Sequence, residues 1–283
     1  MPRAKEAPFF IYPEAAEAAA FEPYMRKAFA EASEGVLLGK ATPDYMLGRG
    51  EVGLETVADR IANACPKVKL IALLRDPIER ALSNHAMEVR RGQERRSADA
   101  ALNDLLAADE LAAARGYPTF VNSYVIQGEY ARILRVFRSR FPAGQILVEH
   151  TRDLAVDPAG LLDRVLAFLG LPVDYRPEGL GMRHFRGGTR KRVDAEAEAS
   201  LLAYLRREVL PHLDGDPDAH AEAFGFFFDT WNVIADDDPT ALSDETRARL
   251  EEHFREDAER LVTLDVAAPW IAEWSARDRD IPM

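Results

Sequence analysis

The apolar positions of the chain fall into two patterns, which are short continuous runs and longer runs with helical spacing. The short runs have the length of buried β-strands and cover residues 35–38, 70–74 and 145–148. The runs with helical spacing cover residues 14–32, 54–64, 98–113, 123–140 and 157–170. Strands that alternate with helices in this way predict an α/β fold with a parallel sheet.

The junction that follows the run Leu70–Leu74 carries the clearest chemical signal. Arg75 ends the predicted strand, and Asp76 and Pro77 are favoured residues for the cap and the first turn of a helix. Ser83 lies two turns further on. Because ligands of open α/β sheets bind at the carboxyl ends of strands, an arginine and a hydroxyl there predict an anion site. A strand that ends in a salt-bridged arginine is the plainer alternative, and the junction alone leaves both readings open.

Other polar side chains in this region have structural explanations. Glu79 and Arg80 are expected to form ion pairs on the helix surface. The histidines His85, His150 and His184 are too scattered to indicate a metal site, and we expect them to satisfy local hydrogen bonds. The sequence therefore predicts no bound metal.

Composition and charge limit the classes of ligand. The 283 residues are 47% hydrophobic, which is enough for a full core, and carry a formal net charge of −12. This charge argues against general nucleic-acid binding, whereas local basic clusters at residues 90–96 and 183–192 suit a small anion. Cys65 is the only cysteine, so neither an intrachain disulfide nor a thiolate metal site can form. Without a signal-peptide-like start or a membrane-spanning run, we expect a cytoplasmic protein with no membrane partner.

Four segments together indicate a family. The Arg-x7-Ser spacing of Arg75 and Ser83 resembles the 3′-phosphate-binding motif of sulfotransferases that use 3′-phosphoadenosine 5′-phosphosulfate (PAPS). Three further segments are similar to the heparan-sulfate type of this family. They are Lys5-Glu6-x-x-Phe9-Phe10, the run Gly39-Lys-Ala-Thr-Pro-Asp-Tyr45, and the stretch from Gly128 to Leu171. The resemblance covers nearly the whole chain except roughly residues 200–240.

This resemblance implies the sulfotransferase fold, a P-loop-NTPase-like parallel sheet flanked by helices, in a single domain over residues 1–283. Residues 200–240 would be a less family-like insertion, and residues 243–274 a C-terminal helical segment. The implied reaction moves a sulfuryl group from PAPS, the co-substrate, to a hydroxyl of a carbohydrate or small metabolite. A homodimer is an open alternative, because the aromatic residues between 219 and 232 suit a core or a dimer contact.

The resemblance also assigns site residues. Glu6 corresponds to the base that takes the proton of the acceptor hydroxyl, while Arg75 and Ser83 would hold the 3′-phosphate. The second nucleotide-binding loop corresponds to a basic, glycine-rich run that comprises Arg186, Gly187, Gly188, Thr189, Arg190 and Lys191. Its glycines would let backbone N–H groups approach phosphate, and its cations would add charge. Two plainer readings stay open, which are a solvated Glu6 and an exposed basic loop.

The sequence departs from the family pattern in two places. The family's 5′-phosphosulfate loop normally precedes the Lys-Glu segment, where this sequence begins, so we expect the first strand, loop and helix of the family to be missing. The family lysine before Thr-Pro is Ala41 here, and Lys40 stands one place earlier, so Lys40 does not inherit that role. The sequence as printed is therefore expected to transfer sulfate poorly. A non-catalytic protein that binds adenosine phosphates, or an interaction module, is the alternative function.

Overall fold

The computed structural model of the chain describes residues 8–33, 35–181, 203, 207 and 241–277. The strands are β1 (Gly48–Arg49), β2 (Val52–Gly53), β3 (Leu70–Leu74) and β4 (Ile146–His150). The α-helices are α1 (Phe21–Ala28), α2 (Leu54–Ala64), α3 (Pro77–Arg90), α4 (Ala98–Asp104), α5 (Ala108–Gly116), α6 (Tyr130–Arg138), α7 (Asp153–Val156), α8 (Pro158–Leu169), α11 (Asp244–Val262) and α12 (Trp270–Arg277). None of the helices in these ranges is both long and apolar enough to cross a membrane.

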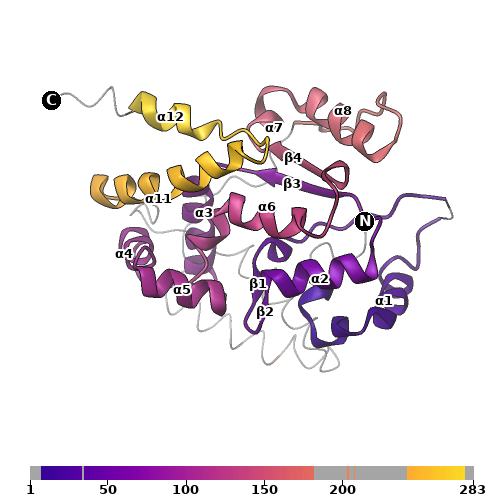
Figure 1. Cartoon of the computed structure of the whole chain (residues 1–283), viewed down its shortest axis with the longest axis horizontal. Coiled ribbons are helices and arrows are strands. Elements are labelled where there is room, and N and C mark those ends of the chain that lie inside the picture. Colours follow the sequence, from indigo (N-terminus) through magenta and orange to yellow (C-terminus); the bar gives the residue numbers. More distant parts are fainter. Residues whose placement is uncertain (1–7, 34, 182–202, 204–206, 208–240, 278–283) are drawn as a thin grey trace.

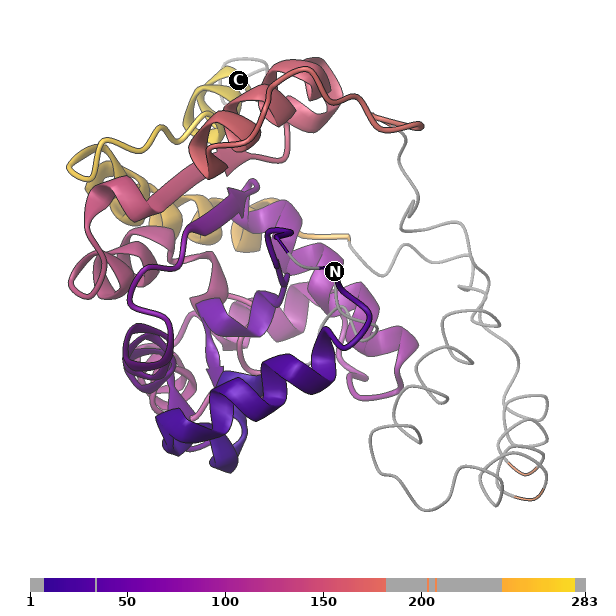
Figure 2. The ribbon, with the colours of Figure 1, turned by 90° about the vertical axis from the view of Figure 1, so that its right-hand side faces the viewer.

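The parallel strands β3 and β4 lie side by side, with helices on both sides of the pair (Figure 1). Their register runs from Leu70 opposite Ile146 to Leu74 opposite His150. Helix α6 lies on one side of the two strands, and α7 and α8 lie on the other, with α1 and α8 at opposite ends of the molecule (Figure 2). A parallel pair needs a long crossover, which α3 to α6 supply here. The predicted α/β class is confirmed.

Local sequence signals set the ends of several elements. Asp157 caps α8 by accepting a hydrogen bond from the Gly160 backbone N–H at 2.9 Å, and Gly170 ends the helix with φ of 78°. By contrast, the helix expected over residues 14–32 is shorter than predicted. Pro23 lacks an N–H group and its ring excludes a helical turn before it, so α1 begins at Phe21 and 3-10 turns precede it.

Two other expectations were wrong in detail. The single helix expected over residues 98–113 is split into α4 and α5 by a turn around Leu105, and Leu105 and Leu111 are both buried. Residues 35–38 do not form a strand. Val36 and Leu37 are 52% and 59% exposed, so this run lacks the packing that would stabilise an extended segment within a sheet.

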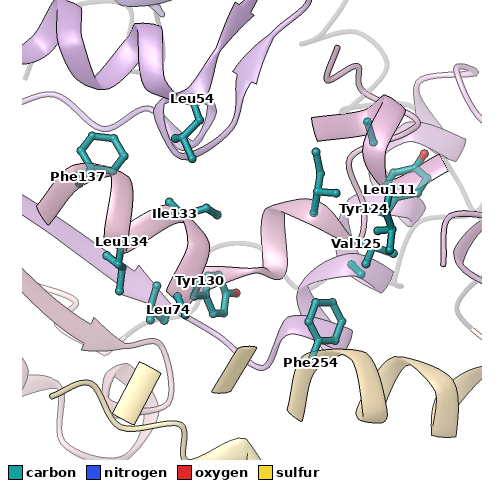
Figure 3. Close-up of a cluster of buried hydrophobic side chains, with 14 of the residues drawn as sticks. Leu54, Leu74, Leu111, Tyr124, Val125, Tyr130, Ile133, Leu134, Phe137 and Phe254 are labelled. Atoms are coloured by element: carbon teal, nitrogen blue, oxygen red, sulfur yellow. The ribbon is translucent and has the colours of Figure 1, made fainter. Parts of the chain in front are cut away.

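The apolar face of α6 forms the centre of the core. Ile133, Leu134 and Phe137 are all buried on this face. In Figure 3, Leu134 lies beside Leu74 of β3, and Phe137 points toward Leu54 of α2. Helix α6 therefore contributes buried apolar side chains to the same core as β3 and α2.

A buried carboxylate cluster fixes the start of α6. Glu129 binds Arg115 at 2.5 Å and Arg132 at 2.6 Å. Burial alone would raise the pKa of Glu129, but hydrogen bonds from His253 and Arg115 bring that pKa down to about 2. Asp257 of α11 accepts hydrogen bonds from two backbone N–H groups in the first turn of α6, at 2.9 and 3.3 Å. The N-terminus of α6 is thereby tied to α5 and α11.

One face of β3 stays accessible. Ile71 and Leu73 are each 42% exposed, although they belong to a strand in parallel pairing. Strands of parallel sheets are usually covered on both faces. The strand therefore presents an apolar surface beside the buried side chain of Leu74, which is 1% exposed.

We predict that Gly128→Ala destabilises the protein, because the turn before α6 has no room for a β-carbon. A β-carbon at this position would lie 2.7 Å from Phe254 Cε1 and 2.9 Å from Pro77 Cβ. Such overpacking should lower the free energy of unfolding by about 1–3 kcal/mol in urea titrations. Gly144→Ala is the matched control, since a β-carbon there meets no atom within 4 Å. Equal stability of the two variants would contradict this prediction.

Candidate functional site

The carboxyl end of β3 and the start of α3 form a sharply capped junction. Asp76 Oδ1 accepts hydrogen bonds from the backbone N–H groups of Ile78 at 2.8 Å and Glu79 at 3.1 Å. Pro77 occupies the first helical position, where the missing N–H group costs nothing. The predicted cap is therefore confirmed, and it fixes the direction in which the chain leaves the strand.

The second oxygen of Asp76 binds the far end of the chain. Asp76 Oδ2 accepts a hydrogen bond of 2.8 Å from the indole Nε1–H of Trp274 on α12. The Trp274 side chain is fully buried. This contact joins residues 198 positions apart, and no local pattern in the sequence indicates it. This hydrogen bond thus fixes the β3–α3 junction against helix α12.

Arg75 and Ser83, the predicted phosphate ligands, both remain accessible at this junction. The side chain of Arg75 is 36% exposed, and one guanidinium nitrogen lies 3.5 Å from Glu79 Oε2. Ser83 is exposed on α3. It lies one helical turn beyond Glu79, so Glu79 and Ser83 share a face of α3. The structure therefore places an arginine, a carboxylate and a hydroxyl along one side of the first turns of α3.

Arg80 differs from the expected surface ion pair. It donates hydrogen bonds to Gln127 Oε1 at 2.9 Å and to the backbone carbonyl of Tyr124. No carboxylate in the described part of the chain pairs with it, and Glu79 instead pairs with Arg75. Burial lowers the pKa of Arg80, and the positive charge of Arg75 acts in the same direction. The expectation that Arg80 lies on the helix surface was wrong, because its guanidinium satisfies a buried turn.

Tyr130, the first residue of α6, contacts this junction. Tyr130 is 3% exposed at the start of α6, and burial raises the pKa of its hydroxyl group. The backbone N–H of Arg75 hydrogen-bonds to this hydroxyl group. Hydrogen bonds hold both Asp76 oxygens in place without removing their charge, so Arg75 and the N-terminus of α3 are the groups that would attract an anion to this junction.

The segment that follows the predicted base is anchored in the core. Phe9, Phe10 and Ile11 are buried, and the Phe9 ring stacks on Tyr24 with ring centroids 4.3 Å apart. Lys40 contacts the Tyr24 hydroxyl, and its ammonium lies 4.7 Å from the Tyr24 ring centroid. Burial lowers the pKa of Lys40 to about 8. Lys40 therefore lies beside the aromatic cluster that holds residues 9–11, a placement that its position in the sequence motif left open.

Several predicted site residues lie outside the described residues. They are Glu6 and the basic run of Arg186, Gly187, Gly188, Thr189, Arg190 and Lys191, together with the aromatic segment 219–232. Of the predicted ligands, the structure thus describes Arg75 and Ser83. Within the described part of the chain, histidine, cysteine and acidic residues form no group that could hold a metal ion.

Comparisons with known proteins bear on this junction. A family described as the sulfotransferase domain matches residues 61–191, a range that includes β3, Arg75 and Ser83. Heparan sulfate glucosamine 3-O-sulfotransferase 3A1 of Mus musculus is 28% identical over 193 residues, which cover 61% of this chain and 45% of that protein. Heparan sulfate glucosamine 3-O-sulfotransferase 3B1 of Homo sapiens is 27% identical over 198 residues, which cover 63% and 47%. The chain spans about half the length of these relatives.

A solved structure shares the fold. The crystal structure of a sulfotransferase from Alicyclobacillus acidocaldarius superposes with a TM-score of 0.50 at 23% sequence identity. The superposed region covers 72% of this chain and 80% of that chain. The arrangement of strands and helices described above is therefore that of an α/β sulfotransferase fold.

We predict that Trp274→Phe destabilises the protein more than Trp270→Phe does. Both substitutions remove an indole N–H and the same ring area from a buried position, but the structure shows no hydrogen-bond partner for Trp270 Nε1. Loss of the bond to the charged Asp76 should cost about 1.5–3 kcal/mol beyond the loss shared by both variants. Urea titrations followed by far-UV circular dichroism measure the difference. Equal losses would show that the Trp274–Asp76 bond contributes nothing.

Proposed function

Because the chain belongs to the sulfotransferase family, we propose that it moves the sulfuryl group of PAPS to a hydroxyl of a carbohydrate or small metabolite. In this proposal Arg75 and Ser83 hold the 3′-phosphate of the nucleotide. The basic run that ends in Arg190 and Lys191 contributes further phosphate contacts. The proposal assigns no metal, since sulfuryl transfer needs positioned charge and a base.

The observation that carries the proposal is that the Arg75 guanidinium is accessible and only weakly paired with a carboxylate. A guanidinium at the carboxyl end of a parallel strand lies where ligands of such sheets bind. Its carboxylate contact, at 3.5 Å between two half-exposed side chains, is worth only about 0–1 kcal/mol. A phosphate can replace that contact and form bidentate hydrogen bonds with the guanidinium. Ser83, two turns along α3, can donate its hydroxyl proton to the same phosphate group.

The chemical step makes a clear demand on the chain. The acceptor oxygen attacks sulfur as the bond between sulfur and the 5′-phosphate oxygen breaks, and the acceptor proton must go to a base. We assign this base to the carboxylate of Glu6. Burial of the neighbouring residues Phe9 and Phe10 supports this role, because an anchored segment can hold a side chain against an acceptor. The departing product is 3′-phosphoadenosine 5′-phosphate (PAP).

The class of acceptor rests on the relatives and on the charge of the neighbourhood. The names of two relatives specify a glucosamine of heparan sulfate, and we take from them only the class of carbohydrate. The Tyr24 ring and the Lys40 ammonium form an aromatic and cationic pair beside residues 9–11. Because Phe9 and Lys40 already cover the Tyr24 ring, the Lys40 ammonium is the group of this pair that can bind the negative charge of an acidic sugar.

A second candidate is a non-catalytic relative that binds adenosine phosphates or a protein partner. The exposed side chains of Ile71 and Leu73 favour it, because an accessible apolar face on a strand suits an interaction surface. Turnover decides between the two. The catalytic reading requires measurable transfer of labelled sulfate from PAPS to a carbohydrate by the full chain, even at the low rate expected from its sequence. The alternative predicts PAP binding without transfer.

We predict that Arg75→Ala weakens PAP binding and leaves ADP binding little changed. Loss of a charge-assisted phosphate contact should cost about 1.5–3 kcal/mol in calorimetric titrations. Arg26→Ala is the control, since Arg26 lies exposed on α1 in an ion pair with Glu22. The assignment would be wrong if the parent protein bound PAP no better than ADP. It would also be wrong if Arg75→Ala bound PAP as the parent does.

We predict that Glu6→Gln lowers the rate of sulfate transfer and spares PAP affinity. Replacing a general base by an amide of the same shape should reduce turnover by roughly 10²–10⁴. Glu14→Gln, at an exposed position in the segment that follows, is the control. The comparison needs full-length protein with measurable transfer. Near-parental turnover by Glu6→Gln would remove Glu6 from the mechanism.

A further inference from the structure

A carboxylate lies within the candidate phosphate site. Glu79 follows Arg75 by four residues and precedes Ser83 by four, so it stands one helical turn before the hydroxyl on the same face of α3. Its Oε2 atom lies 3.5 Å from a guanidinium nitrogen of Arg75. The Arg75 and Glu79 side chains are 36% and 47% exposed, which leaves both free to rearrange.

The other charged groups at the junction have different partners. Asp76 uses one oxygen for the cap of α3 and the other for the indole of Trp274. Arg80 points inward, toward Gln127 and the backbone of Tyr124. Glu79 is therefore the acidic group that can move relative to Arg75 without breaking the cap of α3.

A bound phosphate and the Glu79 carboxylate compete for the Arg75 guanidinium. A phosphate monoester carries about −1.5 to −2 charges at neutral pH, so it attracts Arg75 and repels the Glu79 carboxylate. Phosphate that binds the same guanidinium nitrogen of Arg75 displaces Glu79, and the displaced carboxylate then stays near the bound anion. Because the exposed pair is worth little, this displacement is feasible, but it reduces the net gain from the phosphate contact.

We propose that Glu79 is an internal competitor for Arg75 and thereby sets the affinity and selectivity of the site for a 3′-phosphate. The inference rests on the proposed function, in which Arg75 binds that phosphate. Glu79 occupies the guanidinium when no nucleotide is present. When nucleotide is bound, it weakens the 3′-phosphate contact and so favours release of the PAP product. Glu79 is therefore a specificity-determining residue, because it weakens the contact between Arg75 and the 3′-phosphate.

The test compares PAP with 5′-AMP, which lacks the 3′-phosphate. Glu79→Gln should lower the dissociation constant of PAP roughly fivefold, since it removes both the competing pair and the repulsion. The dissociation constant of AMP should stay within about twofold, because AMP places no charge at Arg75. Glu22→Gln is the matched control, because Glu22 forms an equivalent pair with Arg26, four residues later, on the exposed surface of α1.

A double variant separates the two ways in which the account can fail. In Arg75→Ala/Glu79→Gln, the gain in PAP affinity relative to Arg75→Ala should be smaller than the gain that Glu79→Gln gives in the parent protein. If the parent binds PAP no more tightly than AMP, the proposed function fails. If the parent prefers PAP but Glu79→Gln leaves PAP affinity unchanged or weakens it, the inference about Glu79 is overturned and the assignment of Arg75 stands.

Discussion

The candidate site depends on a single carboxylate that makes two kinds of contact. One oxygen of Asp76 caps the backbone of α3, and the other accepts the indole N–H of Trp274 at 2.8 Å. A cap alone would fix the first turn of the helix but not its place against the rest of the protein. With Trp274 fully buried, the second contact locks the start of α3 to the end of the described chain. These two contacts of Asp76 therefore position Arg75 and Ser83.

Two buried carboxylates hold the start of α6 next to this junction. Glu129 and Asp257 fix the N-terminus of α6, and the first residue of that helix, Tyr130, lies under the β3–α3 junction. The turn before α6 packs Gly128 against Pro77 and Phe254 so closely that a side chain has no room there. Polar contacts thus hold the N-terminus of α6, and the turn before it packs closely against the start of α3.

The sequence could predict those parts of the site that depend on neighbouring residues. The strand over residues 70–74, the Asp76 cap and Pro77 at the first helical position follow from local propensity, and the structure has all three. The bond from Trp274 and the inward turn of Arg80 depend on segments distant in the chain, so no local pattern could indicate them. The start of α1 at Phe21 and the break between α4 and α5 at Leu105 show the same limit, since periodicity finds apolar faces more readily than interruptions in them. Glu6 and the run 186–191 stay predictions.

The central claim is that this locked junction receives a 3′-phosphate, and a structure of the full chain with PAP bound tests it most directly. Our account predicts the 3′-phosphate within hydrogen-bonding distance of the Arg75 guanidinium and of Ser83 Oγ, with Glu79 turned away from Arg75 and the Asp76–Trp274 bond intact. PAP bound elsewhere, with Arg75 still paired to Glu79, would contradict the account.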